Sequence, residues 1–220
     1  MMNQAVSPTM RKTPQSTVKR GRLRASYDRN LVYSVIDEAL VAYLGMVIDG
    51  RPFVQPTSHW RDGDRIYWHG ASKGRMTQGV ESQSVCLTLV LLDGLVMARS
   101  AFHHSVNYRS VMLFGQPEVV DDPVEKEHQL KLFINRLSAG RWDELRPMHE
   151  KELKATGIMC MKIDEGSAKM RAAPPADDRP DYDWPVWAGV LPIGQSWKTP
   201  EPCPDLTGDF APPVMSFSLD

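Results

Sequence analysis

The chain has 220 residues, 42% of them hydrophobic, and a formal net charge of −1 at pH 7. This length suffices for one well-buried domain with an additional tail. The near balance of charge argues against a nucleic-acid-binding protein or a membrane-surface protein, and no segment has the apolar length of a membrane span. Six histidines occur without carboxylates at ligand spacing, and no Gly-x-Ser-x-Gly or Rossmann pattern is present. We therefore expect no metal site, serine-hydrolase site or dinucleotide fold.

The N-terminal segment is strongly basic. Residues 1–24 contain six basic and no acidic side chains and lack an apolar run, which predicts a flexible basic arm rather than a signal peptide. The three cysteines, Cys86, Cys160 and Cys203, are odd in number and form no Cys-x-x-Cys. That pattern argues against a disulfide framework and a zinc site, so we expect free thiols in a cytoplasmic protein.

Residues 25–172 alternate apolar runs with turn signals, which is typical of an antiparallel sheet. Three Asp-Gly pairs, at 49–50, 62–63 and 93–94, are expected to form hairpin turns, because both central residues of a type I′ turn need a positive φ. The expected strands are 41–48, 53–60, 65–69, 85–92, 95–98, 108–120, 158–163 and 168–171. Their order predicts a β-rich α+β fold built on a meander rather than on βαβ units.

Helices are expected at three places. One short helix follows Ser72. A longer one begins at Asp122, a plausible N-cap followed by Pro123, and ends near Gly140; its apolar residues recur at helical spacing. A third short helix is expected at 149–155.

The second Asp-Gly turn fixes an expected pairing in which Trp60 lies opposite Arg65 and Ser58 lies opposite Tyr67. In this register both faces carry polar groups among aromatic rings. A pocket of that composition suits a flat heteroaromatic ligand.

The segment after this hairpin carries Ser72, Lys73 and Arg75 at an expected helix start. The N-terminal end of a helix is already partly positive, so cations there are favourable only when an anion is bound, and the free backbone N–H groups would bind the same anion. We interpret the segment as a phosphate site; the alternative is a surface helix with two solvated cations. A ring and a phosphate on one molecule describe a flavin mononucleotide (FMN) or pyridoxal phosphate.

The C-terminal segment, residues 173–220, has a different composition. Ten of the 17 prolines lie between Pro174 and Pro213, together with three of the six tryptophans. Prolines cannot form a strand ladder, whereas a disordered tail rarely carries three tryptophans. We therefore expect an extended arm that docks on its own domain or on a partner subunit.

Five segments, taken in their order and spacing, resemble the pyridoxamine 5′-phosphate oxidase-related flavin-binding proteins, in the branch of the nitroimidazole-resistance-type proteins. These segments are residues 52–56, 66–75, 93–100, 104–111 and 186–192. The resemblance implies an antiparallel split β-barrel with a few flanking helices. It also implies an obligate-type homodimer that binds FMN at the subunit interface.

The resemblance further implies which residues hold the cofactor. In this family the helix after the third strand holds the phosphate, and the strand before it lines the flavin ring. A later strand contributes from its start, and in the oxidases a C-terminal tryptophan comes from the other subunit. The implied residues are Gln55, Pro56, Thr57, Ser58, Trp68, His69, Ser72, Lys73, Arg75, Met76, Arg109, Ser110 and Trp187.

The resemblance implies an FMN-dependent oxidoreductase that passes electrons from a reduced nicotinamide to a small organic acceptor. Residues 189–194 lack the basic cluster with which the family's oxidases hold their vitamin substrate, so we do not expect oxidation of pyridoxamine phosphate. The alternative is a non-catalytic flavin or haem carrier or sensor, with His59 or His69 as an axial ligand. No residue is assigned as general acid or base.

Overall fold

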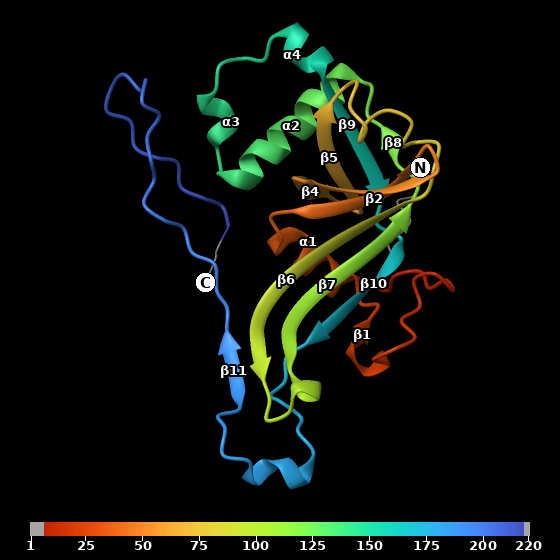
Figure 1. Ribbon diagram of the computed structural model, residues 1–220. Coiled ribbons are helices and arrows are strands. Elements are labelled where there is room, and N and C mark those ends of the chain that lie inside the picture. Colours follow the sequence, from red (N-terminus) through yellow and green to blue (C-terminus); the bar gives the residue numbers. More distant parts are fainter. Residues whose placement is uncertain (1–6, 218–220) are drawn as a thin grey trace.

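Two antiparallel sheets form the body of the computed structural model, which describes residues 7–217 (Figure 1). One sheet has the strand order β1-β10-β7-β6-β2-β3, with β11 also paired to β6, and the other has the order β4-β5-β9-β8. The strands are β1 Ala25–Ser26, β2 Ala42–Ile48, β3 Arg51–Thr57, β4 His59–Asp62, β5 Arg65–Ala71, β6 Val85–Met97, β7 Ser105–Gly115, β8 Glu118–Val119, β9 Thr156–Lys162, β10 Glu165–Arg171 and β11 Gly189–Pro192. The helices are α1 Arg29–Glu38, α2 Pro123–Leu137, α3 Arg141–Glu144 and α4 Glu150–Ala155, with short 3-10 turns η1 Arg22–Arg24, η2 Ala101–His103 and η3 Arg179–Asp183.

The smaller sheet is buried on both faces. Its inner face and the inner face of the larger sheet enclose the main core together with α1; this core includes Val32, Ile36, Leu44, Leu87, Leu89, Val111, Leu113, Ile66, Trp68 and Met159. Helix α2 covers the outer face, where a second cluster contains Trp60, Tyr67, Val120, Leu130, Ile158 and Cys160. Alternate side chains of β5 therefore enter two different apolar environments.

The first two Asp-Gly pairs form turns, one of them in an unexpected register. Asp49 and Gly50 are confirmed as a two-residue turn between β2 and β3, with φ values of 51° and 72°. At the second pair the turn residues are Gly63 and Asp64, so the predicted pairing was wrong by two residues, and Trp60 lies opposite Tyr67. The reason is that Gly63, with φ 57°, takes the first turn position instead of the second.

The third pair, Asp93-Gly94, was wrongly predicted as a hairpin. Strand β6 continues through it, with a bulge between Leu92 and Gly94. Two contacts explain this outcome. The carboxylate of Asp93 accepts a 2.8 Å hydrogen bond from Arg109 on β7, and a Cβ on Gly94 would lie 3.0 Å from the carbonyl oxygen of Leu191. The glycine thus permits the close approach of β11 rather than a reversal of the chain.

The long run predicted as one strand over 108–120 divides at Gly115. There β7 ends, and a Cβ would lie 2.8 Å from the Sδ atom of Met161, so the glycine allows β9 to cross closely. The strand predictions at 158–163 and 168–171 are confirmed as β9 and β10 with different bounds.

Helix α2 begins as predicted and ends earlier. The side chain of Asp122 caps it by accepting a hydrogen bond from the amide of Glu125, and its last residue is Leu137. Gly140, which was expected to end it, is the N-cap of α3 instead. Helix α4 confirms the third predicted helix. Helix α1 was missed, although Asp28 caps it. In the described part of the chain, no helix is long and apolar enough to cross a membrane.

A half-buried arginine joins α2 to the rest of the fold. The Arg136 guanidinium donates to the carbonyl oxygens of Ile36 (3.1 Å), Asp37 (3.0 Å) and Ala39 (2.8 Å) at the end of α1, and to that of His59 on β4. Burial lowers the pKa of Arg136 to about 10. The exposed carbonyls at the C-terminal end of α1 compensate the buried charge, so this residue fixes α2 against the smaller sheet.

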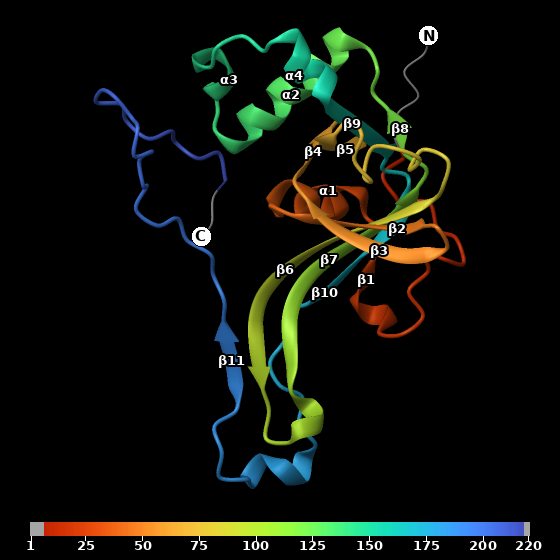
Figure 2. The ribbon, with the colours of Figure 1, turned by 45° about the horizontal axis from the view of Figure 1, so that its top comes forward.

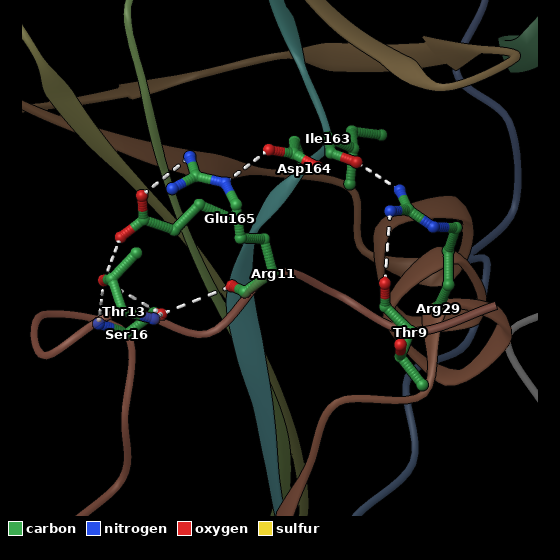
Figure 3. Close-up of polar contacts among 8 residues, drawn as sticks. All are labelled: Thr9, Arg11, Thr13, Ser16, Arg29, Ile163, Asp164 and Glu165. Atoms are coloured by element: carbon green, nitrogen blue, oxygen red, sulfur yellow. Dashed lines mark hydrogen bonds and ion pairs between the residues drawn. The ribbon is translucent and has the colours of Figure 1, made fainter. Parts of the chain in front are cut away.

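The basic N-terminal arm packs against the turn between β9 and β10 (Figure 3). Arg11 forms ion pairs with Asp164 (2.7 Å) and Glu165 (3.1 Å). Arg29 donates to the carbonyl oxygen of Ile163 from the other side, and Met10 is buried. The boundary predicted at residue 24 stays a prediction, but residues 9–16 lie against the body formed by the two sheets.

The C-terminal arm leaves the body along β11 and extends away from the sheets (Figures 1 and 2). At its base Arg171 donates to the side-chain oxygen of Asn107 (2.5 Å), and Arg99 pairs with the buried carboxylate of Asp177 (3.2 Å). Near its end Ser216 donates from its amide to the carbonyl oxygen of Leu137 at the end of α2 (2.9 Å). The aromatic residues between these anchors are mostly exposed.

Candidate functional site

The segment predicted as a helix after Ser72 is a series of tight turns instead. The amide of Gly74 donates to Ala71 (2.7 Å), and the amides of Thr77 and Gln78 both donate to Gly74. The Thr77 hydroxyl also donates to the carbonyl oxygens of Ala71 (2.5 Å) and Gly74 (3.0 Å), which occupies acceptors that a helix would need. This segment therefore has no helix N-terminus that could bind a phosphate. The positive charges of Lys73 and Arg75 are the groups that would attract one.

Lys73 and Arg75 line a cavity of about 430 Å³ between this turn segment and the β2–β3 turn. Arg75 lies over the ring of Phe53 on β3, 5.3 Å from the ring centroid. The remaining lining is about half polar: Val47, Ile48, Asp49, Gly74, Gln78, Gly79, Ser82 and Gln83. Lys73 and Arg75 are exposed cations with amide and hydroxyl neighbours, and together they form a donor set that fits a phosphate group. The carboxylate of Asp49 offsets part of their positive charge.

Trp68 holds this turn segment from beneath. The indole is fully buried in the main core, and its Nε1 atom donates to the carbonyl oxygen of Met76 (3.1 Å). The amide of Ser72 donates to the carbonyl oxygen of Ala155 (2.8 Å). Among the residues implied for the cofactor, Trp68 and Met76 therefore lie behind the cavity and support its wall.

The four implied residues on β3 do not form the expected pocket with β5. Strand β3 pairs with β2 and stops at Thr57, and Ser58 is the corner where the chain passes to the other sheet. Gln55 and Pro56 are exposed on this edge strand, and Thr57 is buried with its hydroxyl donating to Ser58 (3.1 Å). The edge strand and Arg75 nevertheless lie together, because Arg75 contacts Phe53.

His69 faces the side of β5 opposite to Trp68, into an apolar cavity of about 510 Å³ between β5 and the three helices α2, α3 and α4. The other lining residues are Leu130, Phe133, Ile134, Trp142, Leu145, Arg146, Met148, Glu152 and Thr156. The imidazole ring lies 4.9 Å from the Phe133 ring and 6.1 Å from the Trp60 ring, between centroids. One histidine thus projects into a mainly hydrophobic space of the size that organic cofactors occupy.

The His69 imidazole is half-buried and incompletely hydrogen-bonded. Burial lowers its pKa, and its Nδ1 atom is buried without a hydrogen-bond partner within residues 7–217. A buried polar atom without a partner is unfavourable in a folded protein. A neutral imidazole in an apolar cavity is also the form that ligates iron, so the residues present fit a haem with one axial histidine.

His59, the other candidate ligand, is fully buried, and its Nε2 atom lies 2.9 Å from the carbonyl oxygen of Ile36. Burial, together with the nearby charge of Arg136, lowers its pKa to about 4. His59 therefore belongs to the junction of α1, β4 and α2, away from the cavity that His69 lines.

Arg109, Ser110 and Trp187 lie apart from the turn segment within one chain. Arg109 is held by Asp93 and Glu38, and these hydrogen bonds raise its pKa. The Ser110 hydroxyl donates to the carbonyl oxygen of Lys169 (3.1 Å). Trp187 is 61% exposed on the C-terminal arm.

Sequence reasoning missed the helical wall of the His69 cavity. The apolar stripe expected on the longer helix contains Leu130, Phe133 and Ile134. The rest of the cavity wall comes from a loop-rich stretch without periodicity, which carries Trp142, Leu145 and Met148. The stripe alone predicts packing and gives no sign that a cavity is left between the helix and the sheet.

The pyridoxamine 5′-phosphate oxidase family pattern matches residues 28–170. The chain belongs to this family. The two antiparallel sheets with few helices agree with that assignment. A comparison with curated protein sequences gives no match.

Two solved structures of this family resemble the chain over most of its length. The flavocytochrome Anf3 from Azotobacter vinelandii is 45% identical, with a TM-score of 0.88, over 91% of this chain and 94% of that one. The FAD- and haem-binding protein from Mycobacterium smegmatis is 31% identical, with a TM-score of 0.81, over 86% and 94%. A presumed 5-nitroimidazole antibiotic resistance protein from Bacteroides thetaiotaomicron shares the fold, with 20% identity and a TM-score of 0.55, over 66% and 85%.

The buried His59 predicts a specific acid sensitivity. Its pKa is about 4 in the folded chain against 6.5 in the unfolded chain, so the unfolded chain takes up a proton first as the pH falls. We expect its contribution to the free energy of unfolding to decrease by about 2 kcal/mol between pH 7 and pH 5. Urea unfolding of the wild type and of His59→Gln at both pH values measures this; equal pH dependence in the two proteins would contradict it.

Proposed function

We propose that this protein is a redox flavoprotein that also binds haem, with the two cofactors on opposite faces of β5. The observation that carries the proposal is the placement of His69 in an apolar cavity, a few residues before the cations Lys73 and Arg75 at a polar one. The flavocytochrome and the FAD- and haem-binding protein among its relatives support the pairing of a flavin with a haem.

The flavin phosphate is assigned to the polar cavity. Lys73 and Arg75 would bind it, and Trp68 would hold their turn segment in place through the bond to Met76. The flavin ring would lie along β3, near Gln55 and Pro56, whose side chains are exposed and unencumbered by a neighbouring strand. FMN was the expectation from sequence; FAD carries the same phosphate group and is the flavin that one relative is described as binding.

The haem is assigned to the cavity behind α2. His69 would supply an axial nitrogen, and the aromatic and aliphatic side chains of α2 and of residues 142–148 would exclude water from the ring. A bound flavin exchanges hydride or single electrons and a haem exchanges single electrons, so the pair supports an oxidoreductase. We propose a reduced nicotinamide as donor and a small organic molecule as acceptor. A flavin and haem carrier or sensor without turnover is the alternative.

A homodimer is proposed from the outer face of the larger sheet. Alternate residues of β2, β3, β6 and β7 expose an apolar surface there, formed by Tyr43, Val47, Val54, Val90, Leu92 and Met112. A continuous apolar face of this kind marks a protein interface. Ser110 lies on the same face as Met112, so a second copy would bring it to the interface. We also propose a cytoplasmic location, because Cys86, Cys160 and Cys203 are free thiols.

Removal of both phosphate-site cations is expected to weaken flavin binding. Charge-assisted hydrogen bonds contribute roughly 1.5–3 kcal/mol each, so Lys73→Ala with Arg75→Ala should raise the dissociation constant by about 100-fold or more. Titration of flavin-free protein with FMN and with FAD measures this. The control Lys131→Ala with Arg141→Ala also removes two surface cations. An unchanged dissociation constant for both flavins would place the phosphate elsewhere.

His69→Ala is expected to abolish the Soret absorption band while flavin absorbance remains. His128→Ala, an exposed histidine on α2, is the matched control and should keep both. Added imidazole should restore the Soret band in His69→Gly, because a free ligand can enter the space that the side chain leaves. A Soret band that persists in His69→Ala would contradict the axial assignment.

A further inference from the structure

The two ends of the chain carry opposite charge. Residues 1–24 contain six basic and no acidic side chains, and residues 173–220 contain eight acidic and two basic ones. The near-neutral total of the chain conceals this separation. Opposite charge on two surface segments steers and orients the contact between them.

The basic arm is an ordered, exposed surface. Turn η1 is closed by a 2.9 Å hydrogen bond from the amide of Arg24 to the carbonyl oxygen of Gly21, and Leu23, between Arg22 and Arg24, is completely exposed. Within residues 7–217, Arg11 is the basic residue of this arm that forms ion pairs. A cavity of about 540 Å³ beside the turn is lined by Lys12, Thr17, Val18, Lys19, Arg22, Ala25 and Tyr27. The arm therefore offers unpaired cations next to apolar side chains.

The acidic arm presents the complementary chemistry. Its carboxylates at Asp183, Glu201, Asp205 and Asp209 are exposed. Trp184, Trp187, Trp197 and Phe210 lie on the same arm and are between 49% and 68% exposed. Exposed aromatic side chains on an extended segment are stabilised when another surface covers them.

In the part of the chain that the structure describes, the basic and acidic arms lie on opposite sides of the two sheets and do not meet (Figures 1 and 2). We propose that the basic arm of one copy, residues 12–24, is the docking surface for the acidic C-terminal arm of a second copy. This proposal rests on the homodimer proposed above. In a twofold dimer the contact forms twice, and each basic arm pairs with the acidic arm of the partner. An acidic carrier protein or an anionic lipid surface is the competing occupant.

Two charge-reversed variants test the contact directly. The first carries Lys19→Glu, Arg20→Glu, Arg22→Glu and Arg24→Glu, so both of its arms are acidic. The second carries Asp183→Lys, Glu201→Lys, Asp205→Lys and Asp209→Lys, so both of its arms are basic. Each homodimer then has two repulsive contacts, whereas a heterodimer of the two variants has two attractive ones.

Native mass spectrometry of an equal mixture, after subunit exchange at low salt, gives the ratio of heterodimer to homodimers. Random mixing gives about one, and the proposal predicts roughly a fivefold excess of heterodimer that disappears at high salt. The control is a mixture of wild type with Lys126→Glu/Lys131→Glu, which reverses two cations on α2. Flavin and haem spectra in each variant report folding and the cofactor sites separately.

A ratio near one at low salt would overturn the proposed contact, and so would wild-type protein that is monomeric. In the first case the homodimer and the cofactor assignments stand; in the second the homodimer fails as well. Binding of the wild type to an acidic protein or to anionic vesicles, lost in the first variant while the mixing ratio stays near one, would assign the basic arm to that occupant instead.

Discussion

The burial of the smaller sheet on both faces is the constraint on which the rest of the structure depends. Because side chains alternate along β5, Trp68 enters the core between the sheets, whereas Tyr67 and His69 face helix α2. The indole then fixes the turn segment that carries Lys73 and Arg75, and the imidazole lines the cavity under the helices. The alternation of side chains along β5 thus positions two cavities of different chemistry, one at Lys73 and Arg75 and one at His69. A shift of β5 by one residue would exchange the two faces and remove both sites.

The helical side of the molecule depends on a second constraint, the placement of α2. Arg136 joins it to the end of α1 and to β4 through four backbone carbonyls, and the same junction buries His59. Even a half-buried guanidinium is costly unless its donors are satisfied, so this geometry is specific. The position of α2 sets the width of the His69 cavity, since Leu130, Phe133 and Ile134 form its wall. Burial against this lining, in turn, lowers the pKa of the imidazole.

Local signals in the sequence predicted the elements better than their pairing. Asp49-Gly50 and the Asp122 cap were predicted correctly because turn and capping chemistry act within a few residues. The register at Gly63 and the bulge at Asp93 depend on distant partners, such as Arg109 and Leu191, which a local pattern does not contain. Lys73 and Arg75 were interpreted as a phosphate site because a helix was expected to begin there. That helix is absent, although both residues do line a cavity. The flavin was predicted from the family resemblance. The cavity that distinguishes His69 from His59 could be found only from the three-dimensional structure.

The cofactor content of the protein as purified tests the central claim most directly. Mass spectrometry of the small molecules released on denaturation, with absorbance of the folded protein, gives the amounts of flavin and haem per chain. We predict both, in equal proportion, because the chain has a cavity lined by Lys73 and Arg75 just after β5 and an apolar cavity lined by His69 on β5. Protein that carries neither group and takes up neither when supplied would contradict it.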